Sequence, residues 1–192
     1  MPVNQGEILL PIARSSISEA LGQPYEATEN AAWLQDKAAC FVTLTQQQQL
    51  RGCIGTLEAH RSLLEDVKSN ARAAALQDTR FSPLTAKELN FTEIEVSLLS
   101  AMEPVNFSNE QEALAQLRPG IDGVAFEYGS YRSTFLPQVW QQLPDTKEFI
   151  AHLKHKAGLS RDFWADQVKL SIYTVTKWQE QDCTERVKEQ AL

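Results

Sequence analysis

Hydrophobic residues recur at helical spacing in two long segments of the chain. The first segment carries its apolar positions at Ile8, Leu9, Ile12, Ile17 and Leu21. Residues three or four apart share one face of a helix, so this spacing predicts an amphipathic helix that ends at Gly22. The second segment, residues 61–76, keeps an apolar stripe at helical period and is rich in good helix formers. We therefore expect two long helices in the first half of the chain.

Capping patterns predict shorter helices. Thr85 with Glu88 fits a capping box, in which the two side chains bond each other's backbone N–H groups. Asp145 with Glu148 fits the same pattern and opens a helix that Gly158 terminates in a left-handed cap. Two further short helices are expected at residues 108–117 and 137–142.

Alternation of apolar and polar residues predicts the strands. In residues 92–99, Ile94, Val96 and Leu98 alternate with polar side chains, which is typical of a strand with one buried face. Residues 168–178 alternate in the same way and predict one last strand. Two hairpins are expected, residues 39–44 with 50–54 across a polar loop, and residues 124–128 with 131–136 across Gly129-Ser130.

The order of these elements predicts the fold class. Strands joined by hairpins and helices, without a regular βαβ period, indicate an α+β fold with antiparallel sheets and flanking helices. A length of 192 residues fits one domain or two tightly packed subdomains. The turn at residues 118–123 is the expected subdomain division, because it separates a first strand-helix-strand group from a second. Residues 179–192 are polar and are expected to form a tail.

Composition narrows the classes of function. Eighteen basic and 25 acidic side chains give a net charge of −7, which repels phosphate backbones and anionic membranes, so we expect neither nucleic acid nor a membrane as a partner. No apolar run approaches the ~20 residues of a membrane span, and residues 1–7 lack the layout of a signal peptide. Three cysteines, an odd number, favour reduced thiols and a cytoplasmic location.

The segment Leu50–Gly55 is the main candidate for chemistry. Strand alternation places Leu50, Gly52 and Ile54 on one face and Arg51, Cys53 and Gly55 on the other. Arg51 and Cys53 then have Cα atoms about 7 Å apart. A guanidinium near a thiol favours the thiolate, the form that acts as nucleophile or metal ligand. The glycines beside Cys53 leave backbone N–H groups open to a ligand or to a developing negative charge.

Each of these residues also has a structural interpretation. Free cysteines are among the most buried residues, and a glycine within a strand often marks tight packing. Cys40 fits a core position and Cys183 a tail thiol. Glu95 points away from the apolar side of its strand, where it would pair with Arg51 or act as a general base if the two strands are neighbours. Otherwise Glu95 belongs to an exposed polar face.

The chain shows no recognisable metal or cofactor site. His152 and His155 lie three apart on a predicted helix and, with His60 or Cys53, are the candidate metal ligands, but no carboxylate or cysteine pair completes a pattern. The three cysteines lack the spacing that an iron–sulfur cluster needs. Phosphate-binding loops, dinucleotide fingerprints and nucleophile elbows are also missing from the sequence. We expect solvated histidines, no metal and no cofactor.

An ordered set of motifs resembles the AMMECR family. The most specific is Leu50–Leu57, which reads Leu-Arg-Gly-Cys-Ile-Gly-Thr-Leu. The other motifs follow at residues 78–84, 94–99, 120–123, 136–139 and 156–159. The resemblance therefore covers nearly the whole chain in order. Two positions depart from the family pattern: the turn before the first motif lacks a glycine that is common there, and Ser82 replaces a frequent proline.

The resemblance implies a fold of two subdomains with the six-residue motif near their junction. It also implies that prokaryotic members like this one act as the A component of the AmmeMemoRadiSam system, beside a Memo-like protein and a radical SAM protein. Gln138 and Lys156, which lie in family-like motifs, join the candidate ligand-binding residues Leu50, Gly52, Ile54 and Gly55. The resemblance carries no established reaction.

Two functions therefore remain open. The first is an accessory enzyme, with Cys53 as nucleophile or ligand contact, Arg51 as its electrostatic partner and Glu95 as a candidate base. The second is a binding or regulatory module that docks a partner protein or a small ligand in the same groove without chemistry. The sequence does not predict the oligomeric state.

Overall fold

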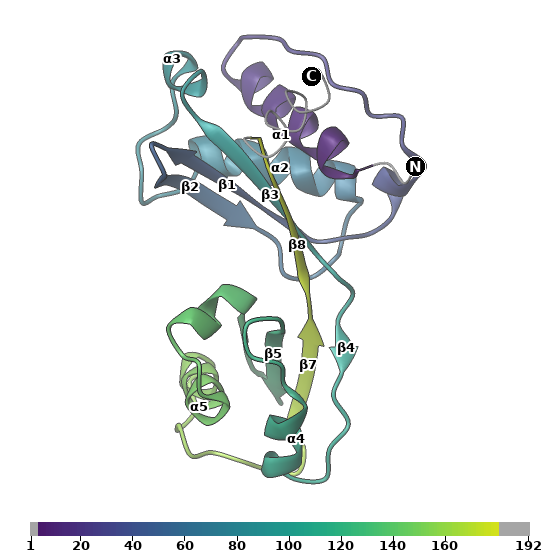
Figure 1. Ribbon diagram of the computed structural model, residues 1–192, viewed down its shortest axis with the longest axis vertical. Helices are drawn as coiled ribbons and strands as arrows, with labels where there is room; N and C mark the ends of the chain where they lie inside the picture. The colour runs from purple at the N-terminus through teal and green to yellow at the C-terminus, as the bar shows by residue number, and fades with distance from the viewer. Residues whose placement is uncertain (1–3, 181–192) are drawn as a thin grey trace, which may run out of the picture. The chain divides into compact units, whose positions relative to one another are not determined.

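Residues 4–180 are described by the computed structural model and form two units (Figure 1). The first unit comprises the described residues up to Leu99 together with those from Thr176 onward. The second unit comprises Ser100–Val175. The expected division at residues 118–123 lies inside the second unit, so the sequence placed this boundary wrongly. The Arg118 turn has a local role instead, because the Asp122 carboxylate accepts from the Arg118 backbone N–H at 2.8 Å and pairs with its guanidinium at 2.6 Å.

The first unit is a four-stranded sheet with helices on one face. Its helices are α1 (Gly6–Ala20), η1 (Ala32–Gln35, a 3₁₀ helix), α2 (Leu63–Leu76) and α3 (Ala86–Leu89). Its strands are β1 (Cys40–Gln46), β2 (Gln49–Gly55), β3 (Glu93–Leu99) and β8 (Val175–Gln179). They lie in the order β2-β1-β3-β8, and β1 is antiparallel to both β2 and β3. Strand β2 is therefore an edge strand.

One face of this sheet and two helices enclose the core of the first unit. Cys40, Val42 and Leu44 alternate along β1 and are buried with the apolar faces of α1 and α2. Figure 1 shows both helices on this side of the sheet. Burying each large aliphatic side chain contributes about 1.5–3 kcal/mol. The opposite face carries the residues between them, including Thr43 and Thr45, and none of the helices of this unit within residues 4–180 covers it.

The hairpin between β1 and β2 is tighter than the sequence predicted. Only Gln47 and Gln48 connect the two strands, and their φ angles are 50° and 63°. Two residues with positive φ form the turn that matches the twist of a hairpin, a place that usually holds Asn-Gly. This turn therefore places two glutamines in a conformation that costs side-chain-bearing residues about 1–2 kcal/mol each.

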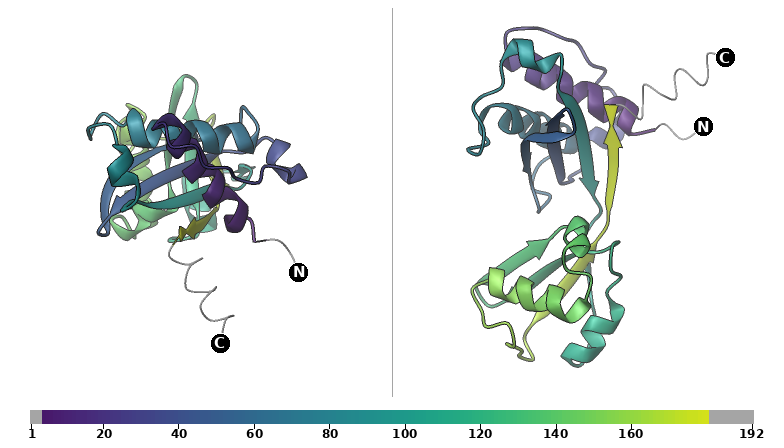
Figure 2. Two further views of the ribbon diagram at one scale, coloured as in Figure 1. Left: turned by 90° about the horizontal axis from the view of Figure 1, so that it is seen from above. Right: turned by 60° about the vertical axis from the view of Figure 1, so that its left-hand side comes forward.

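The second unit is a smaller antiparallel sheet with its own core. Its helices are α4 (Glu110–Gln116), η2 (Pro137–Gln141, a 3₁₀ helix) and α5 (Thr146–Lys156). Its strands β4 (Glu103–Pro104), β5 (Gly123–Tyr128), β6 (Tyr131–Phe135) and β7 (Lys169–Tyr173) lie in the order β4-β7-β5-β6. Helix α5 lies against this sheet (Figure 2). Its Phe149 ring stacks on Trp140 with centroids 3.6 Å apart, at the centre of the core.

Comparison with the expected elements confirms the fold class and corrects one strand. The described residues form an α+β fold with two antiparallel sheets, as predicted. The expected single strand at residues 168–178 is two strands that break at Thr174 and join different sheets. Leu170 and Ile172 pack against the second core and Trp178 against the first, so apolar residues occur on both sides of the break and do not mark it. The short elements η1 and β4 were not predicted.

Candidate functional site

The two glycines of the Leu50–Gly55 motif are sites of close packing. Gly52 faces α2, where an added Cβ atom would lie 2.2 Å from the backbone carbonyl oxygen of Ala74. Gly55 lies against the Phe41 ring, which a Cβ atom would meet at 2.2 Å. Ile54 packs against the core between them. Neighbouring groups thus fill the space that a side chain would take at both glycines.

A bulge changes the orientation expected for the start of the motif. The pairing of β1 with β2 shifts between Leu44 and Thr45, so Gly52 lies opposite Leu44 and Leu50 lies opposite Thr45. The extra residue is Arg51. Leu50 therefore leaves the buried face and is 43% exposed, so the expected grouping of Leu50 with Gly52 and Ile54 is wrong. Strand alternation fails here because a bulge inserts one unpaired residue.

The Arg51 side chain lies beside Glu88 rather than Glu95. Its guanidinium pairs with the Glu88 carboxylate at 3.2 Å and lies 6.0 Å from the centre of the Phe81 ring. Glu88 also caps α3, and bonds from the Thr85 backbone N–H and hydroxyl, with Arg51, hold its pKa below the usual range. The Nη1 atom of Arg51 is buried and has no hydrogen-bond partner in the described part of the chain. Strand β1 lies between β2 and β3, so the condition for a pairing of Arg51 with Glu95 is not met, and Arg51 pairs with Glu88 instead.

Cys53 has contacts on both its side chain and its backbone. The Thr43 hydroxyl donates to the Cys53 thiol at 3.3 Å, and the thiol is half-buried on the helix-free face of the sheet. The backbone N–H of Cys53 donates to Asp78 Oδ2 at 2.9 Å. Arg80 donates to the Cys53 carbonyl at 3.2 Å. Side chains thus satisfy both the N–H and the carbonyl of Cys53 on this edge strand.

Asp78 and Arg80 form a clamp that the sequence analysis missed. They pair at 2.6 Å, and the Asp78 side chain is only 4% exposed. Bonds from Arg80, and then from the Cys53 N–H, hold the pKa of Asp78 well below its usual range, although burial opposes the shift. In the sequence, these two residues stood out only as part of the family-like motif at residues 78–84. The signal was present, since residues 78–84 resemble a family motif and carry two opposite charges two residues apart.

Glu95 lies in the same cross-strand row as Cys53 but at a distance. Both residues are paired with Thr43, Cys53 from β2 and Glu95 from β3. Because neighbouring strands lie about 4.8 Å apart, the two backbones are separated by roughly 10 Å. The Glu95 carboxylate accepts from Ser97 at 3.1 Å and pairs with Lys177 at 3.1 Å. We call Cys53, Thr43, Glu95 and Lys177 the thiol row.

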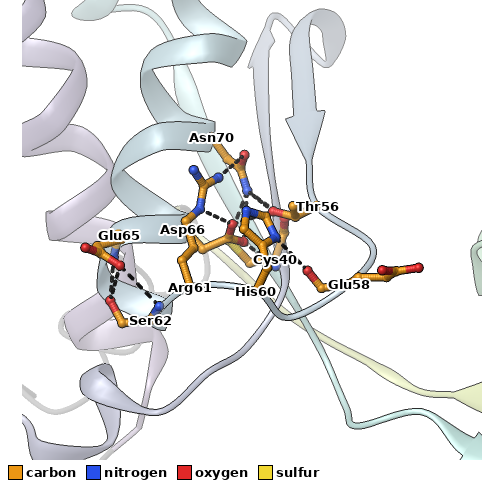
Figure 3. Close-up of polar contacts among 9 residues, drawn as sticks. All are labelled: Cys40, Thr56, Glu58, His60, Arg61, Ser62, Glu65, Asp66 and Asn70. Carbon is orange, nitrogen blue, oxygen red and sulfur yellow. Dashed lines mark hydrogen bonds and ion pairs between the residues drawn. The ribbon is translucent and has the colours of Figure 1, made fainter.

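A second polar network lies on the helix side of the same unit. The fully buried Asp66 accepts from the Cys40 backbone N–H at 2.8 Å, from Arg61 Nε at 2.7 Å and from the Thr56 hydroxyl (Figure 3). Asn70 donates to Asp66 at 3.0 Å. Burial raises the pKa of the Cys40 thiol, and the Asp66 carboxylate adds to this. The network thus holds a neutral Cys40 and ties β1 to α2.

Gln138 and Lys156 belong to the second unit. Lys156 donates to the Thr134 carbonyl at 2.9 Å, and its ammonium group lies 5.1 Å from the centre of the Phe135 ring. Gln138 is exposed on η2. The candidate residues are therefore divided between two units, and Lys156 has a local role on the outer edge of β6.

The histidines have local partners or lie in solvent. His60 contacts the Glu58 carbonyl at 3.0 Å, His152 contacts Arg161, and His155 is exposed. Within residues 4–180, no group of three His, Cys, Asp or Glu side chains is arranged to hold a metal ion. No helix in that part of the chain is long and apolar enough to cross a membrane. Cys183 lies outside the described residues.

The motifs brought together at Cys53 agree with comparisons to known proteins. A family model described as AMMECR1 matches residues 10–178. Protein MJ0810 of Methanocaldococcus jannaschii is 35% identical over 175 residues, which cover 88% of this chain and 87% of that protein. Protein NEQ441 of Nanoarchaeum equitans is 36% identical over 169 residues, with coverages of 86% and 93%.

A solved structure is also similar. The crystal structure of the uncharacterized protein PH0010 from Pyrococcus horikoshii aligns with a TM-score of 0.77 at 32% identity, and the match covers 91% of each chain. The same fold thus accompanies the shared sequence along nearly the full length of both chains. This chain belongs to the AMMECR1 family.

Proposed function

We propose that the protein is a binding module that docks a partner protein on the thiol row, without covalent chemistry at Cys53. The observation that carries this proposal is the clamp on the Cys53 backbone. A nucleophilic cysteine usually needs a nearby donor for the developing oxyanion, and its own N–H is a common choice. Here that N–H is bonded to Asp78 at 2.9 Å. The thiol is nevertheless half-exposed on an open sheet face.

The neighbours of the thiol also favour binding over catalysis. The side chain that bonds the thiol is the hydroxyl of Thr43, which is not a general base at neutral pH. Glu95 is engaged by Lys177, and strand spacing puts it about 10 Å away, beyond hydrogen-bond reach. A thiol, a hydroxyl and an ion pair in one row offer hydrogen-bonding groups and both signs of charge, which a partner protein with complementary charges can match.

The candidate partners come from the resemblance noted in the sequence. It points to a Memo-like protein and a radical SAM protein as the companions of a chain of this kind. A protein that works beside these two without catalysing a reaction needs a surface that contacts them. The thiol row offers polar groups for that contact. We therefore propose these two proteins as partners of the thiol row.

Binding assays with both proteins test the proposal. Purified full-length chain is titrated with each partner under reducing, anaerobic conditions, and complex formation is measured by calorimetry. Glu95→Lys reverses one charge of the row and is expected to weaken binding at least about tenfold. Glu26→Lys, an exposed site on the loop after α1, is the matched control. No complex with either protein, or equal weakening by both variants, would contradict the proposal.

Catalysis by Cys53 is the second candidate, favoured by the bond from Thr43 to an accessible thiol. Cys53→Ser separates the two functions, because serine keeps a small polar group in the row but removes the thiolate. A binding module is expected to retain partner affinity and cellular function in this variant. Retained affinity with complete loss of cellular function would instead identify Cys53 as a nucleophile.

A further inference from the structure

A polar groove lies along α2 of the first unit, apart from the thiol row. Its volume is about 670 Å³, within the range of small-molecule sites. It is lined by His60, Arg61, Glu65, Lys68, Ser69, Arg72 and Gln77. The helix-free face that carries Cys53 is on the other side of the sheet. The groove is therefore a separate candidate site.

Arg61 is the most firmly held side chain of this groove. Its Nε atom donates to the buried Asp66 at 2.7 Å, and Nη2 donates to Asn70 at 3.3 Å (Figure 3). Asp66 is fully buried and is itself fixed by Cys40 and Thr56. These bonds use one edge of the guanidinium. The Nη1 atom has no partner within residues 4–180 and is left for a ligand.

Other groups in the groove are also unused by the fold. The Ser69 hydroxyl and the Gln77 amide make no hydrogen bond within the described part of the chain. His60 donates from Nδ1 to the Glu58 carbonyl, so Nε2 of the neutral ring is an acceptor and is not counted among the anion-binding groups. Glu65, which is the acidic side chain lining the groove, is engaged with Ser62 in the cap of α2. Arg61 Nη1 can only donate, and the Ser69 hydroxyl and the Gln77 amide can each donate to a ligand as well as accept from it.

Two more cations lie along the same helix face. Lys68 pairs with Glu29 at 2.6 Å and Arg72 pairs with Glu19 at 2.9 Å. Both pairs reach solvent, with 30% and 45% of the cationic side chains exposed. Exposed pairs are weak and exchange easily with water or other acceptors. Lys68 and Arg72 can therefore turn to a ligand that offers better acceptors.

We propose that this groove binds a small anionic molecule through its phosphate or carboxylate groups. The free end of the Arg61 guanidinium, Nη1 with the second N–H of Nη2, can donate two parallel bonds to such a group. Lys68 and Ser69 both lie about two turns beyond Arg61 and supply further donors to a ligand with more than one anionic group. The whole chain carries −7, so the attraction is local to these side chains rather than a property of the surface.

Titration of the full chain with two anions tests this proposal. Inorganic pyrophosphate and citrate are titrated at constant ionic strength, with chloride as the balancing anion, and binding is followed by calorimetry and amide NMR shifts. Saturable binding with shifts confined to residues 60–77 is the expected result. Pyrophosphate alone binding identifies a phosphate ligand, and citrate alone a carboxylate ligand. Absence of saturable binding by both anions overturns the proposal.

Single substitutions of surface cations test whether the anion binds in this groove. Lys68→Gln is expected to weaken the tighter anion about tenfold, the effect of one charge-assisted hydrogen bond. Lys87→Gln removes the same charge from the exposed surface of α3 and is expected to leave the affinity unchanged. Arg61→Lys keeps the charge beside Asp66 but loses the two parallel donors, so it should also weaken binding. If Lys68→Gln and Lys87→Gln change the anion affinity equally, the anion does not bind in the groove along α2.

Discussion

Asp78 accepts the backbone N–H of Cys53 at 2.9 Å, so a side chain from one motif closes the strand edge formed by another. Exposed strand edges invite pairing with other chains, and proteins protect them. Lys156 provides similar cover in the second unit, where it bonds the Thr134 carbonyl of edge strand β6. Asp78 and Lys156 both lie in family-like motifs, and both bond backbone groups at the edge of a sheet. Their role there is structural.

The Asp78 clamp predicts an acid-dependent loss of stability. Asp78→Asn removes the ion pair with Arg80 and should lower the free energy of unfolding at pH 7 by about 1.5–3 kcal/mol. The folded pKa of Asp78 lies below its unfolded value of about 3.9, so the unfolded state binds more protons in this range. The difference between wild type and variant should be complete above pH ~5 and shrink as the pH falls below ~4.

Urea unfolding between pH 2.5 and 7 measures this difference. Asp36→Asn, an exposed carboxylate on the loop after η1, serves as the control and should show little pH-dependent difference from wild type. A difference at Asp78 that stays constant down to pH 2.5 would show that the clamp does not depend on the carboxylate charge.

The close packing around Gly52 predicts that one added methyl group lowers the stability of the protein strongly. Gly52→Ala places Cβ against the backbone of α2, which cannot move as a flexible side chain can, and should cost at least about 1–3 kcal/mol. Gly22→Ala is the comparison, because its φ of 73° causes strain but no neighbour lies within 4 Å. Its expected cost is about 1 kcal/mol. Thermal unfolding ranks the two variants, and a smaller effect at Gly52 would contradict the observed packing.

The turn of the first hairpin predicts a stabilising change. Replacing Gln47 and Gln48 by Asn and Gly supplies residues that adopt positive φ with little strain, so the free energy of unfolding should rise by about 1–2 kcal/mol. Equilibrium urea unfolding measures the change. The same replacement at Gln141-Gln142, where φ at Gln142 is −96°, should not stabilise the protein. If the urea concentration at half unfolding is unchanged in the hairpin variant, Gln47 and Gln48 do not have the strained, positive-φ conformation described above.

The two described cysteines should differ in reactivity. Cys53 is half-buried, whereas Cys40 is fully buried and burial raises its pKa. In a Cys183→Ser background, a thiol reagent should label Cys53 in the native protein. Cys40 should react at least about a thousandfold more slowly, because it must wait for unfolding. Mass spectrometry of timed samples assigns the labels, and comparable rates would mean that the core around Cys40 opens readily.

Local signals in the sequence predicted much of the fold. Thr85 and Asp145 each accept from the backbone N–H three residues on, as their capping patterns indicated. The helix expected at residues 61–76 begins at Leu63, after a capping box at Ser62. Such features depend on a few neighbouring residues, so a single sequence suffices to find them.

The features of the site that sequence reasoning missed depend on contacts between distant segments. Arg51 pairs with Glu88 because a bulge interrupts the register of β2, and alternation alone does not reveal a bulge. Asp78 is 25 residues from Cys53 and lies in a polar turn, where a charged residue is unremarkable. Glu95 was correctly expected on a polar face, but its partner Lys177 comes from the far end of the chain.

The break at Thr174 has a consequence for synthesis on the ribosome. The second unit is one uninterrupted segment, Ser100–Val175, whereas the sheet of the first unit is incomplete until β8 has been made. A nascent chain emerges from its N-terminus, so most of the first unit leaves the exit tunnel early and waits without its last strand. The unit that is translated later can therefore complete its fold first, and the first unit closes only after β8 has emerged.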